Sequence, residues 1–267
     1  MTGRSEKVTF PGADGVMLAG RLDWPLGTPR AFALFAHCFT CSKDIFAASR
    51  VAQGLAARGF AVLRFDFTGL GASEGEFANT NFSSNAGDLV AAAAFLRQTY
   101  DAPKLLVGHS LGGAAVLKAA PDIAEAVAVA TIGAPFDPEH VKHNFDAKID
   151  EITADGEARV TLAGREFCIK QQFLEDIAAQ ALGDAIAGMR KALLVMHSPL
   201  DETVSIDNAS GIFLAAKHPK SFVSLDDADH LLTRRDDAMY VAKVLSAWAT
   251  RFLPELGDGL TLSLIHI

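Results

Sequence analysis

Residues 104–111 read KLLVGHSL and Gly112 follows, so positions 108–112 form the pattern G-x-S-x-G. An apolar strand pattern, Lys104–Val107, precedes it, and a helix pattern of small residues, Leu111–Ala120, follows it. A serine on such a tight strand-to-helix turn has a strained backbone, and glycines two residues before and after it remove side chains that would collide there. The five-letter pattern alone often arises by chance, but this context predicts that Ser110 is a nucleophile.

Strands and helices alternate along most of the chain. The expected strands are Lys7–Phe10, Met17–Leu22, Ala31–Ala36, Phe60–Phe65, Lys104–Val107, Ala126–Ile132, Ala192–Met196 and Ser221–Leu225, and the expected helices are Phe46–Arg58, Asn85–Tyr100, Leu111–Ala120, Ile206–Ala216 and Asp236–Phe252. The first two strands should pair as a hairpin. This alternation predicts an α/β fold, with a mostly parallel central sheet and helices on both faces.

Residues 136–188 depart from the alternation and are expected to form a small lid-like insertion in one domain that spans residues 1–254. The segment contains a possible hairpin, Ala158–Leu162 with Glu166–Ile169, and then a helix that begins at Gln171. It also supplies aromatic residues that could line an apolar site for an acyl group, namely Phe136, Phe145, Phe167 and Phe173. Ordinary core packing is the commoner role for each of them.

A serine hydroxyl needs a base to take its proton, and a carboxylate to orient that base. His230 follows the strand pattern Ser221–Leu225, in a loop at the end of the sheet where sites of parallel sheets collect. Asp201 follows Ala192–Met196 in the same way. The three candidates therefore occur along the chain in the order serine, acid, histidine, which is typical of a G-x-S-x-G nucleophile. The rivals of Asp201 are Glu202 and Asp207.

Five other histidines are weaker candidates. His218 precedes its strand and so lies at the wrong end of the sheet, His109 is expected to be buried packing, and His197 comes just before the position of the acid. His140 lies close to His143 in the insertion, where a metal site is conceivable but a solvated surface is the commoner outcome. No metal and no other cofactor is expected.

Two backbone amides could bind the negative oxygen that develops during acyl transfer. The amide of Leu111 follows the nucleophile at the positive end of a helix. The second donor should come from the loop after Ala31–Ala36, and we assign it to Phe39. That loop reads HCFTCS, so Cys38 and Cys41 form a C-x-x-C pair between a strand and a helix. Such a placement is also typical of thiol-redox pairs.

Composition and charge limit the partners of the 267-residue chain. Half of the residues are hydrophobic, and the net charge is −8 with no basic cluster, which argues against nucleic acid as a partner. There is no signal-peptide pattern and no apolar run that is long enough to span a bilayer. The three cysteines are therefore expected to be reduced thiols in a cytoplasmic protein without a membrane partner.

The end of the chain does not fit this domain. Residues 255–267 form an apolar tail with no expected partner, and we interpret them as the mark of a truncation or of a cloning scar.

Residues 7–254 resemble the α/β-hydrolase superfamily. His37-Cys38-Phe39 resembles its His-Gly-Phe oxyanion segment, with cysteine in place of the usual glycine. The segment 66–73 resembles its D-x-x-G-x-G-x-S loop, and Gly108–Gly112 with the Asp201 and His230 loops completes the match. The segments HCFTCSKD, FDFTGLGASEGEFANTNFSSN, TIGAPFDPEHV and HSPLDETVSIDNAS resemble hydrolase domains that are fused to a C-terminal OsmC-like domain in bacteria. The resemblance implies a bacterial, cytoplasmic setting.

The sequence thus predicts an esterase in which Ser110, Asp201 and His230 form a triad and the Phe39 and Leu111 amides form an oxyanion hole. A small-molecule ester, with a short acyl chain, is the expected substrate of a monomer or homodimer. A thioesterase, an acyltransferase or a peptidase-like hydrolase could use the same triad, because fold alone does not choose the substrate. A thiol-redox role of Cys38 and Cys41, or a partner-binding module that kept only the fold, are alternatives from other classes.

Overall fold

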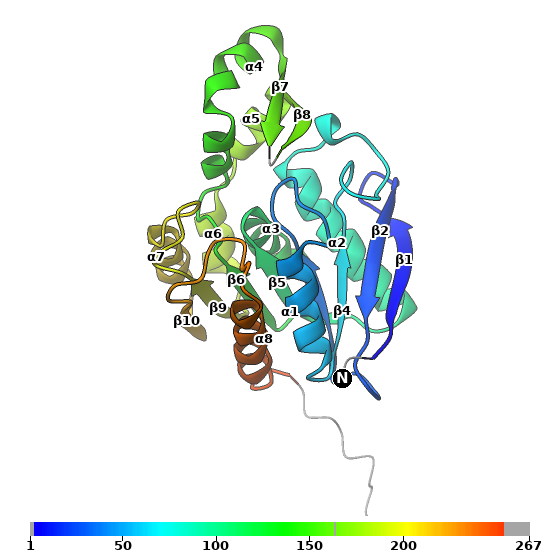
Figure 1. The fold of residues 1–267 in the computed structure, drawn as a ribbon. Coiled ribbons are helices and arrows are strands. Elements are labelled where there is room, and N and C mark those ends of the chain that lie inside the picture. Colours follow the sequence, from blue (N-terminus) through cyan, green and yellow to red (C-terminus); the bar gives the residue numbers. More distant parts are fainter. Residues whose placement is uncertain (1–2, 163, 254–267) are drawn as a thin grey trace, which may run out of the picture.

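The computed structural model describes residues 3–162 and 164–253 (Figure 1). The strands are β1 (Ser5–Pro11), β2 (Met17–Asp23), β3 (Ala31–Ala36), β4 (Phe60–Phe65), β5 (Pro103–His109), β6 (Ala128–Ile132), β7 (Glu157–Leu162), β8 (Arg165–Lys170), β9 (Ala192–His197) and β10 (Lys220–Ser224). The helices are α1 (Phe46–Ala56), α2 (Phe82–Thr99), α3 (Leu111–Ala119), α4 (Ile149–Asp155), α5 (Gln171–Ala178), α6 (Leu182–Gly188), α7 (Asp207–Ala215) and α8 (Arg235–Ala249).

The central sheet has eight strands in the order β1-β2-β4-β3-β5-β6-β9-β10. Strand β2 is antiparallel to both of its neighbours, and every pair from β4 to β10 is parallel. The predicted α/β fold with a mostly parallel sheet is therefore confirmed. All functional loops that follow parallel strands meet at one edge of such a sheet, the edge at the top of Figure 1.

Two hydrophobic cores enclose the sheet, one on each face. Alternate residues of β3 divide between them, because successive side chains of a strand point to opposite faces. Phe32 and Leu34 belong to the core that contains α2 and α3. Ala33 and Phe35 belong to the core formed with α1 and α8. Burial on both faces explains why β3 is apolar throughout rather than alternating.

Helix α2 begins one turn earlier than the sequence pattern predicted, at Phe82 rather than at Asn85. Asn81 caps it: the Asn81 side chain accepts a hydrogen bond from the Ser84 amide at 2.8 Å, and the Ser84 hydroxyl accepts one from the Asn81 amide at 2.9 Å. This reciprocal pair satisfies two backbone donors at the helix start.

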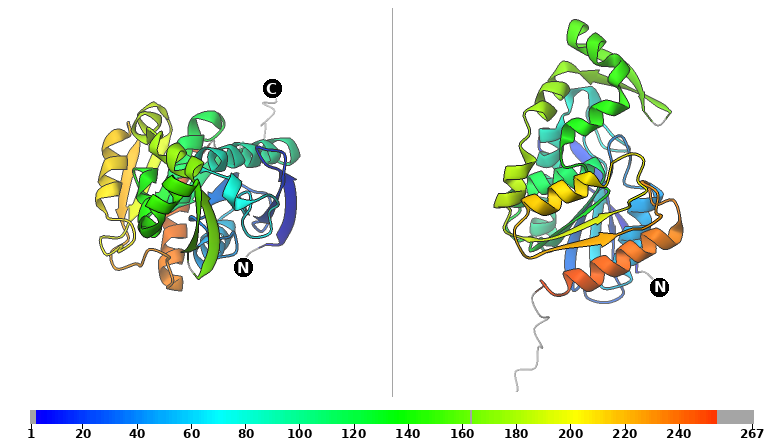
Figure 2. Two further views of the ribbon diagram at one scale, coloured as in Figure 1. Left: turned by 90° about the horizontal axis from the view of Figure 1, so that it is seen from above. Right: turned by 90° about the vertical axis from the view of Figure 1, so that its left-hand side faces the viewer.

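The insertion stands above the carboxyl edge of the sheet (Figures 1 and 2). Strands β7 and β8 form the expected antiparallel hairpin, and α5 begins at Gln171 as expected. Helix α6 packs against α3 and α7 in the main helical layer, so the part that projects is shorter than residues 136–188. The insertion is anchored to the start of α2, where Ser83 donates to Asp176 at 2.5 Å and Asn81 donates to Gln172 at 2.9 Å.

Within the described residues, no helix combines the length and the apolar character needed to cross a membrane. The tail at residues 255–267, which we interpreted as a truncation or scar, lies outside the described residues.

Candidate active site

Ser110 lies between the end of β5 and the start of α3, at the top of the sheet. Its backbone has φ 56° and ψ −129°, a conformation that a residue other than glycine rarely adopts. A Cβ atom at Gly108 would lie 2.2 Å from the Gly112 carbonyl oxygen, and one at Gly112 would lie 2.3 Å from the His37 carbonyl oxygen. Both glycines are therefore required for the turn that presents the Ser110 hydroxyl.

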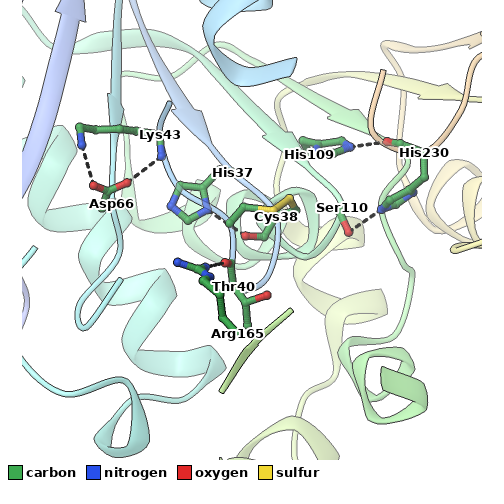
Figure 3. The surroundings of a disulfide bond; sticks show 10 residues. His37, Cys38, Thr40, Lys43, Asp66, His109, Ser110, Arg165 and His230 are labelled. Carbon is green, nitrogen blue, oxygen red and sulfur yellow. Dashed lines mark hydrogen bonds and ion pairs between the residues drawn. A yellow bond between two sulfur atoms is a disulfide. The ribbon is translucent and has the colours of Figure 1, made fainter. Parts of the chain in front are cut away.

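His230 lies in the loop between β10 and α8, with its ring facing Ser110 (Figure 3). The Ser110 hydroxyl donates to His230 Nε2 at 3.0 Å, and His230 Nδ1 donates to Asp201 Oδ2 at 2.7 Å. This proton arrangement follows from the carboxylate, which only accepts and so requires the proton on Nδ1. The lone pair of Nε2 is consequently free to take the Ser110 proton.

Asp201 lies in the loop after β9 and is 9% exposed. Its Oδ1 accepts hydrogen bonds from the amides of Thr203 and Val204, both at 2.9 Å. Burial by itself would raise the pKa of Asp201, but the bonds from His230, Val204 and Thr203 outweigh burial and lower the pKa below its ordinary value. The side chain is a carboxylate at neutral pH and suits the task of orienting the imidazole.

The rival residues lie elsewhere. Glu202 is exposed, and Asp207 starts α7, where it accepts a hydrogen bond from the Ser205 hydroxyl at 3.3 Å. His218 precedes β10 and lies at the opposite end of that strand from the His230 loop. His197 is buried and lies 3.6 Å from Asp201 Oδ2, and its Nε2 donates to the Val204 carbonyl at 2.8 Å. Burial lowers the pKa of His197, so it is a neutral part of the Asp201 loop.

His109 has a role beyond the predicted packing. It is fully buried, and its Nε2 donates to the main-chain carbonyl of His230 at 2.7 Å. Burial lowers the pKa of His109 to about 4, so the ring is neutral at neutral pH. Its hydrogen bond fixes the main chain of the His230 loop. No sequence signal pointed to this contact, because the two residues lie 121 positions apart in the chain.

The two residues whose amides are assigned to the oxyanion hole, Phe39 and Leu111, line one small cavity. Leu111 is the first residue of α3, and the first amides of a helix have no acceptor within the helix. Phe39 follows β3, and its ring contacts those of Phe77 and Phe173, with centroids 5.7 and 5.5 Å apart. No acceptor for the Phe39 amide occurs among residues 3–162 and 164–253.

The expectation that all cysteines are reduced is wrong for two of the three. Cys38 and Cys41 form a disulfide, with Cα atoms 5.3 Å apart, whereas Cys168 is a free thiol. The expectation rested on the absence of a secretion signal, which concerns the compartment and not the local geometry. A C-x-x-C turn brings its two side chains together, and here that turn contains Phe39.

The loop 66–73, which resembles the D-x-x-G-x-G-x-S motif, is bonded to the segment that follows β3. Asp66 is fully buried, and its carboxylate accepts from the amide and the ammonium of Lys43, at 2.7 and 2.6 Å, and from the amide of Ala72 at 2.9 Å. A Cβ atom at Gly71 would lie 2.2 Å from Asp66 Oδ2. The motif is therefore explained by a buried carboxylate whose hydrogen bonds fix two loops.

The insertion contacts two loops of the site, the loop after β3 and the loop after β9. Arg165, at the start of β8, donates to the Thr40 carbonyl, and His140 Nε2 donates to the Thr203 carbonyl at 2.7 Å. His143 contacts Asp146 at 3.1 Å, and no group of three or more possible metal ligands occurs within the described residues. Neither Arg165 nor Thr40 carried a sequence signal, because their contact joins residues 125 positions apart.

Two cavities adjoin the His230 loop. One of about 450 Å³ is lined mainly by apolar atoms and lies between the loop that follows Phe39 and the loop that follows His230. Its walls include Thr40, Cys41, Ile45, Arg165 and Leu231. The other, of about 440 Å³, is lined by His230 and Leu231 together with the acidic residues Glu202, Asp227 and Asp229. Of the aromatic residues expected at an acyl site, Phe145 and Phe173 are buried in the core.

Comparison with known proteins agrees with the fold described above. Residues 33–244 match the sequence model of the Alpha/beta hydrolase family. The chain belongs to the alpha/beta hydrolase family. No curated protein matches it significantly.

Several solved structures share this alpha/beta hydrolase fold. The esterase domain of a Rhodothermus marinus protein is 51% identical, with a TM-score of 0.78 over 94% of this chain and 100% of that one. Est1E from Butyrivibrio proteoclasticus, with ferulic acid bound, is 20% identical, with a TM-score of 0.75 over 92% and 99% of the two chains. The mouse alpha/beta hydrolase domain-containing protein 10 is also 20% identical, with a TM-score of 0.76 over 92% and 99%. The latter two show the fold alone.

Proposed function

We propose that this alpha/beta hydrolase cleaves carboxylic esters through an acyl-enzyme on Ser110. One observation carries the proposal: the Ser110 hydroxyl donates to His230, which donates to the buried Asp201, on the turn that G-x-S-x-G forms. The 51% identity with an esterase domain supports ester hydrolysis as the general reaction.

In the proposed mechanism, His230 Nε2 takes the Ser110 proton as Oγ attacks the ester carbonyl carbon. Asp201 stabilises the imidazolium that forms, and the amides of Phe39 and Leu111 donate to the negative oxygen. His230 then gives its proton to the leaving alcohol. Water, activated by His230, releases the acyl group and restores Ser110.

Labelling with a fluorophosphonate tests the nucleophile. The folded protein should be labelled on Ser110, and Ser110→Ala should be neither labelled nor active on p-nitrophenyl acetate. Ser210→Ala is a matched control, since this serine is exposed on α7, and it should be labelled normally. A folded protein that carries no label on Ser110 would disprove the proposal.

We further propose a preference for short acyl chains, because the projecting part of the insertion is small. A series of p-nitrophenyl esters from acetyl to long-chain acyl groups tests this. The kcat/KM should fall as the chain lengthens, and a steady rise would contradict the proposal. Thioester, amide and acyl-transfer substrates belong in the same panel, because the same triad could act on each of them.

The disulfide favours a second candidate, a thiol-redox role of Cys38 and Cys41. Reduction by a dithiol would deliver two electrons and two protons to the disulfide and oxidise the reductant to its own disulfide. Mass spectrometry of protein alkylated before and after dithiothreitol should show that two thiols appear on reduction. If Cys38 and Cys41 are fully alkylated in protein kept under mild oxidation, a redox role is excluded.

The remaining proposals concern the setting of the molecule. We propose a bacterial, cytoplasmic protein that is a monomer or homodimer, acts on a small-molecule ester and contacts neither nucleic acid nor membrane. A natural fusion to a C-terminal OsmC-like domain is proposed from the sequence segments quoted above. Light scattering on purified protein measures the oligomeric state directly, and a species larger than a dimer would contradict the expectation.

A further inference from the structure

The Phe39 amide lies in a strained turn. The Cys41 amide donates to the Cys38 carbonyl at 3.2 Å, so residues 38–41 form a four-residue turn that the disulfide also closes. Thr40 occupies the third position with φ 58°, where glycine is favoured and a β-branched residue is an outlier. Such a conformation persists only where its surroundings impose it.

The first peptide of this turn sets the direction of the proposed oxyanion donor. The Phe39 N–H and the Cys38 carbonyl belong to one planar trans peptide and point in opposite directions. The Cys38 carbonyl lies 2.8 Å from His37 Nδ1 as well as 3.2 Å from the Cys41 amide. These two bonds hold the Cys38 carbonyl in place. The Thr40 carbonyl takes part in neither of them and needs a partner of its own.

Arg165 supplies that partner from the insertion. Its guanidinium donates to the Thr40 carbonyl (Figure 3). It also lies over the Phe167 ring of the same hairpin, 5.1 Å from the ring centroid. Thr40 is 6% exposed, so its carbonyl has little access to water as an alternative partner. A hydrogen bond from a charged donor is stronger than a neutral one.

We propose that Arg165 is a positioning residue for acyl transfer: it holds Thr40 at positive φ and thereby keeps the Phe39 amide directed at the Ser110 site. The inference rests on the proposed function. Without Arg165, Thr40 can relax to a negative φ, and the turn that contains Phe39 rotates with it. Contact between the insertion and the core would in this way become a condition for oxyanion binding, although the insertion contributes no catalytic residue.

Kinetics of Arg165→Ala on p-nitrophenyl acetate test the proposal. Loss of an oxyanion donor lowers kcat by about 10²–10³-fold, and a loosened donor should lower it less, by about tenfold, with little change in KM. Arg165→Lys should restore part of kcat, since an ammonium can donate to the same carbonyl. Arg159→Ala, which removes an exposed arginine from the same hairpin, is the matched control and should keep wild-type kcat.

Arg165→Ala in a Thr40→Gly protein distinguishes a positioning role of Arg165 from a general contribution to the stability of the fold. Glycine adopts positive φ without strain, so Thr40→Gly should make Arg165 dispensable. In that background Arg165→Ala should lower kcat less than twofold, and fluorophosphonate labelling rates should follow the same pattern. An unchanged tenfold loss with Thr40→Gly would overturn the proposal, as would wild-type kcat or a pure rise in KM for Arg165→Ala. If Ser110→Ala remains active, the proposed function itself has failed instead.

Discussion

Replacing Asp201 with asparagine is the most direct test of the triad. The side chain keeps its shape, and its oxygen can still accept the hydrogen bonds from the Thr203 and Val204 amides, both at 2.9 Å. The amide group then faces His230 Nδ1, which lies 2.7 Å from Asp201 Oδ2 in the wild type. An amide donates a proton there, so His230 must carry its own proton on Nε2 and cannot accept one from Ser110.

The wrong tautomer should cost about 10⁴-fold in kcat, which corresponds to about 5 kcal/mol in the activation barrier. Stability should change much less, by roughly 1.5–3 kcal/mol, the typical contribution of one hydrogen bond to a charged group. The lowered pKa of Asp201 gives that contribution a pH dependence. It is complete above the ordinary Asp pKa of about 3.9 and is lost as the pH falls through the lower pKa of the folded state.

The assay is kcat on p-nitrophenyl acetate at pH 7.5, together with thermal unfolding of each variant. Glu202→Gln is the matched control, because this exposed neighbour is the local rival for the acid and should keep wild-type kcat. The reasoning is refuted if Asp201→Asn is folded and within tenfold of wild type, or if Glu202→Gln shows the larger loss.

Three further predictions concern stability and the site. Burial lowers the pKa of His109 to about 4 from its ordinary 6.5, so the unfolded chain takes up a proton first as the pH falls. The free energy of unfolding should therefore fall by up to roughly 3 kcal/mol between about pH 6.5 and pH 4. His109→Phe should flatten this pH dependence in urea unfolding, and an unchanged dependence would assign it to another residue. Gly112→Ala should destabilise by at least about 1–3 kcal/mol, because its Cβ would meet backbone oxygens at 2.3 and 2.6 Å. Gly188→Ala, with no atom within 4 Å of its Cβ, should leave Tm equal or higher, and equal effects of the two would contradict the steric argument. Phe173→Ala should lower the free energy of unfolding by about 3–5 kcal/mol, because Phe173 is 3% exposed. It should also lower kcat, since the Phe173 ring packs on that of Phe39. A stable variant with low kcat would limit the role of Phe173 to the site.

Local patterns predicted most of the fold. The apolar run Ala31–Ala36 became β3 with the same bounds, because burial on both faces leaves a clear signal in composition. The start of α2 was missed by one turn, since its cap depends on a reciprocal bond between Asn81 and Ser84 rather than on an apolar period. The hairpin of the insertion was also visible in the sequence.

The candidate site was predicted only where chemistry and chain order coincide. The structure brings Ser110, His230 and Asp201 within hydrogen-bonding distance, as their order in the sequence suggested, and their catalytic roles stay predictions. The contact of Arg165 with Thr40 could not be predicted, because it depends on how the insertion lies on the core. The disulfide contradicts the prediction of reduced thiols, because the spacing of Cys38 and Cys41, and not the compartment, decides the distance between their side chains.

The place where the insertion leaves the sheet has a consequence for redesign. Strands β6 and β9 are parallel neighbours, so any chain of this topology needs a crossover between them, and α6 already provides its helix. The hairpin and α4 are added to a connection that the sheet requires in any case. Grafting a different cap between β6 and α6 should therefore preserve the scaffold. If Arg165 acts as proposed, a graft without a donor for the Thr40 carbonyl should fold well and hydrolyse p-nitrophenyl acetate slowly.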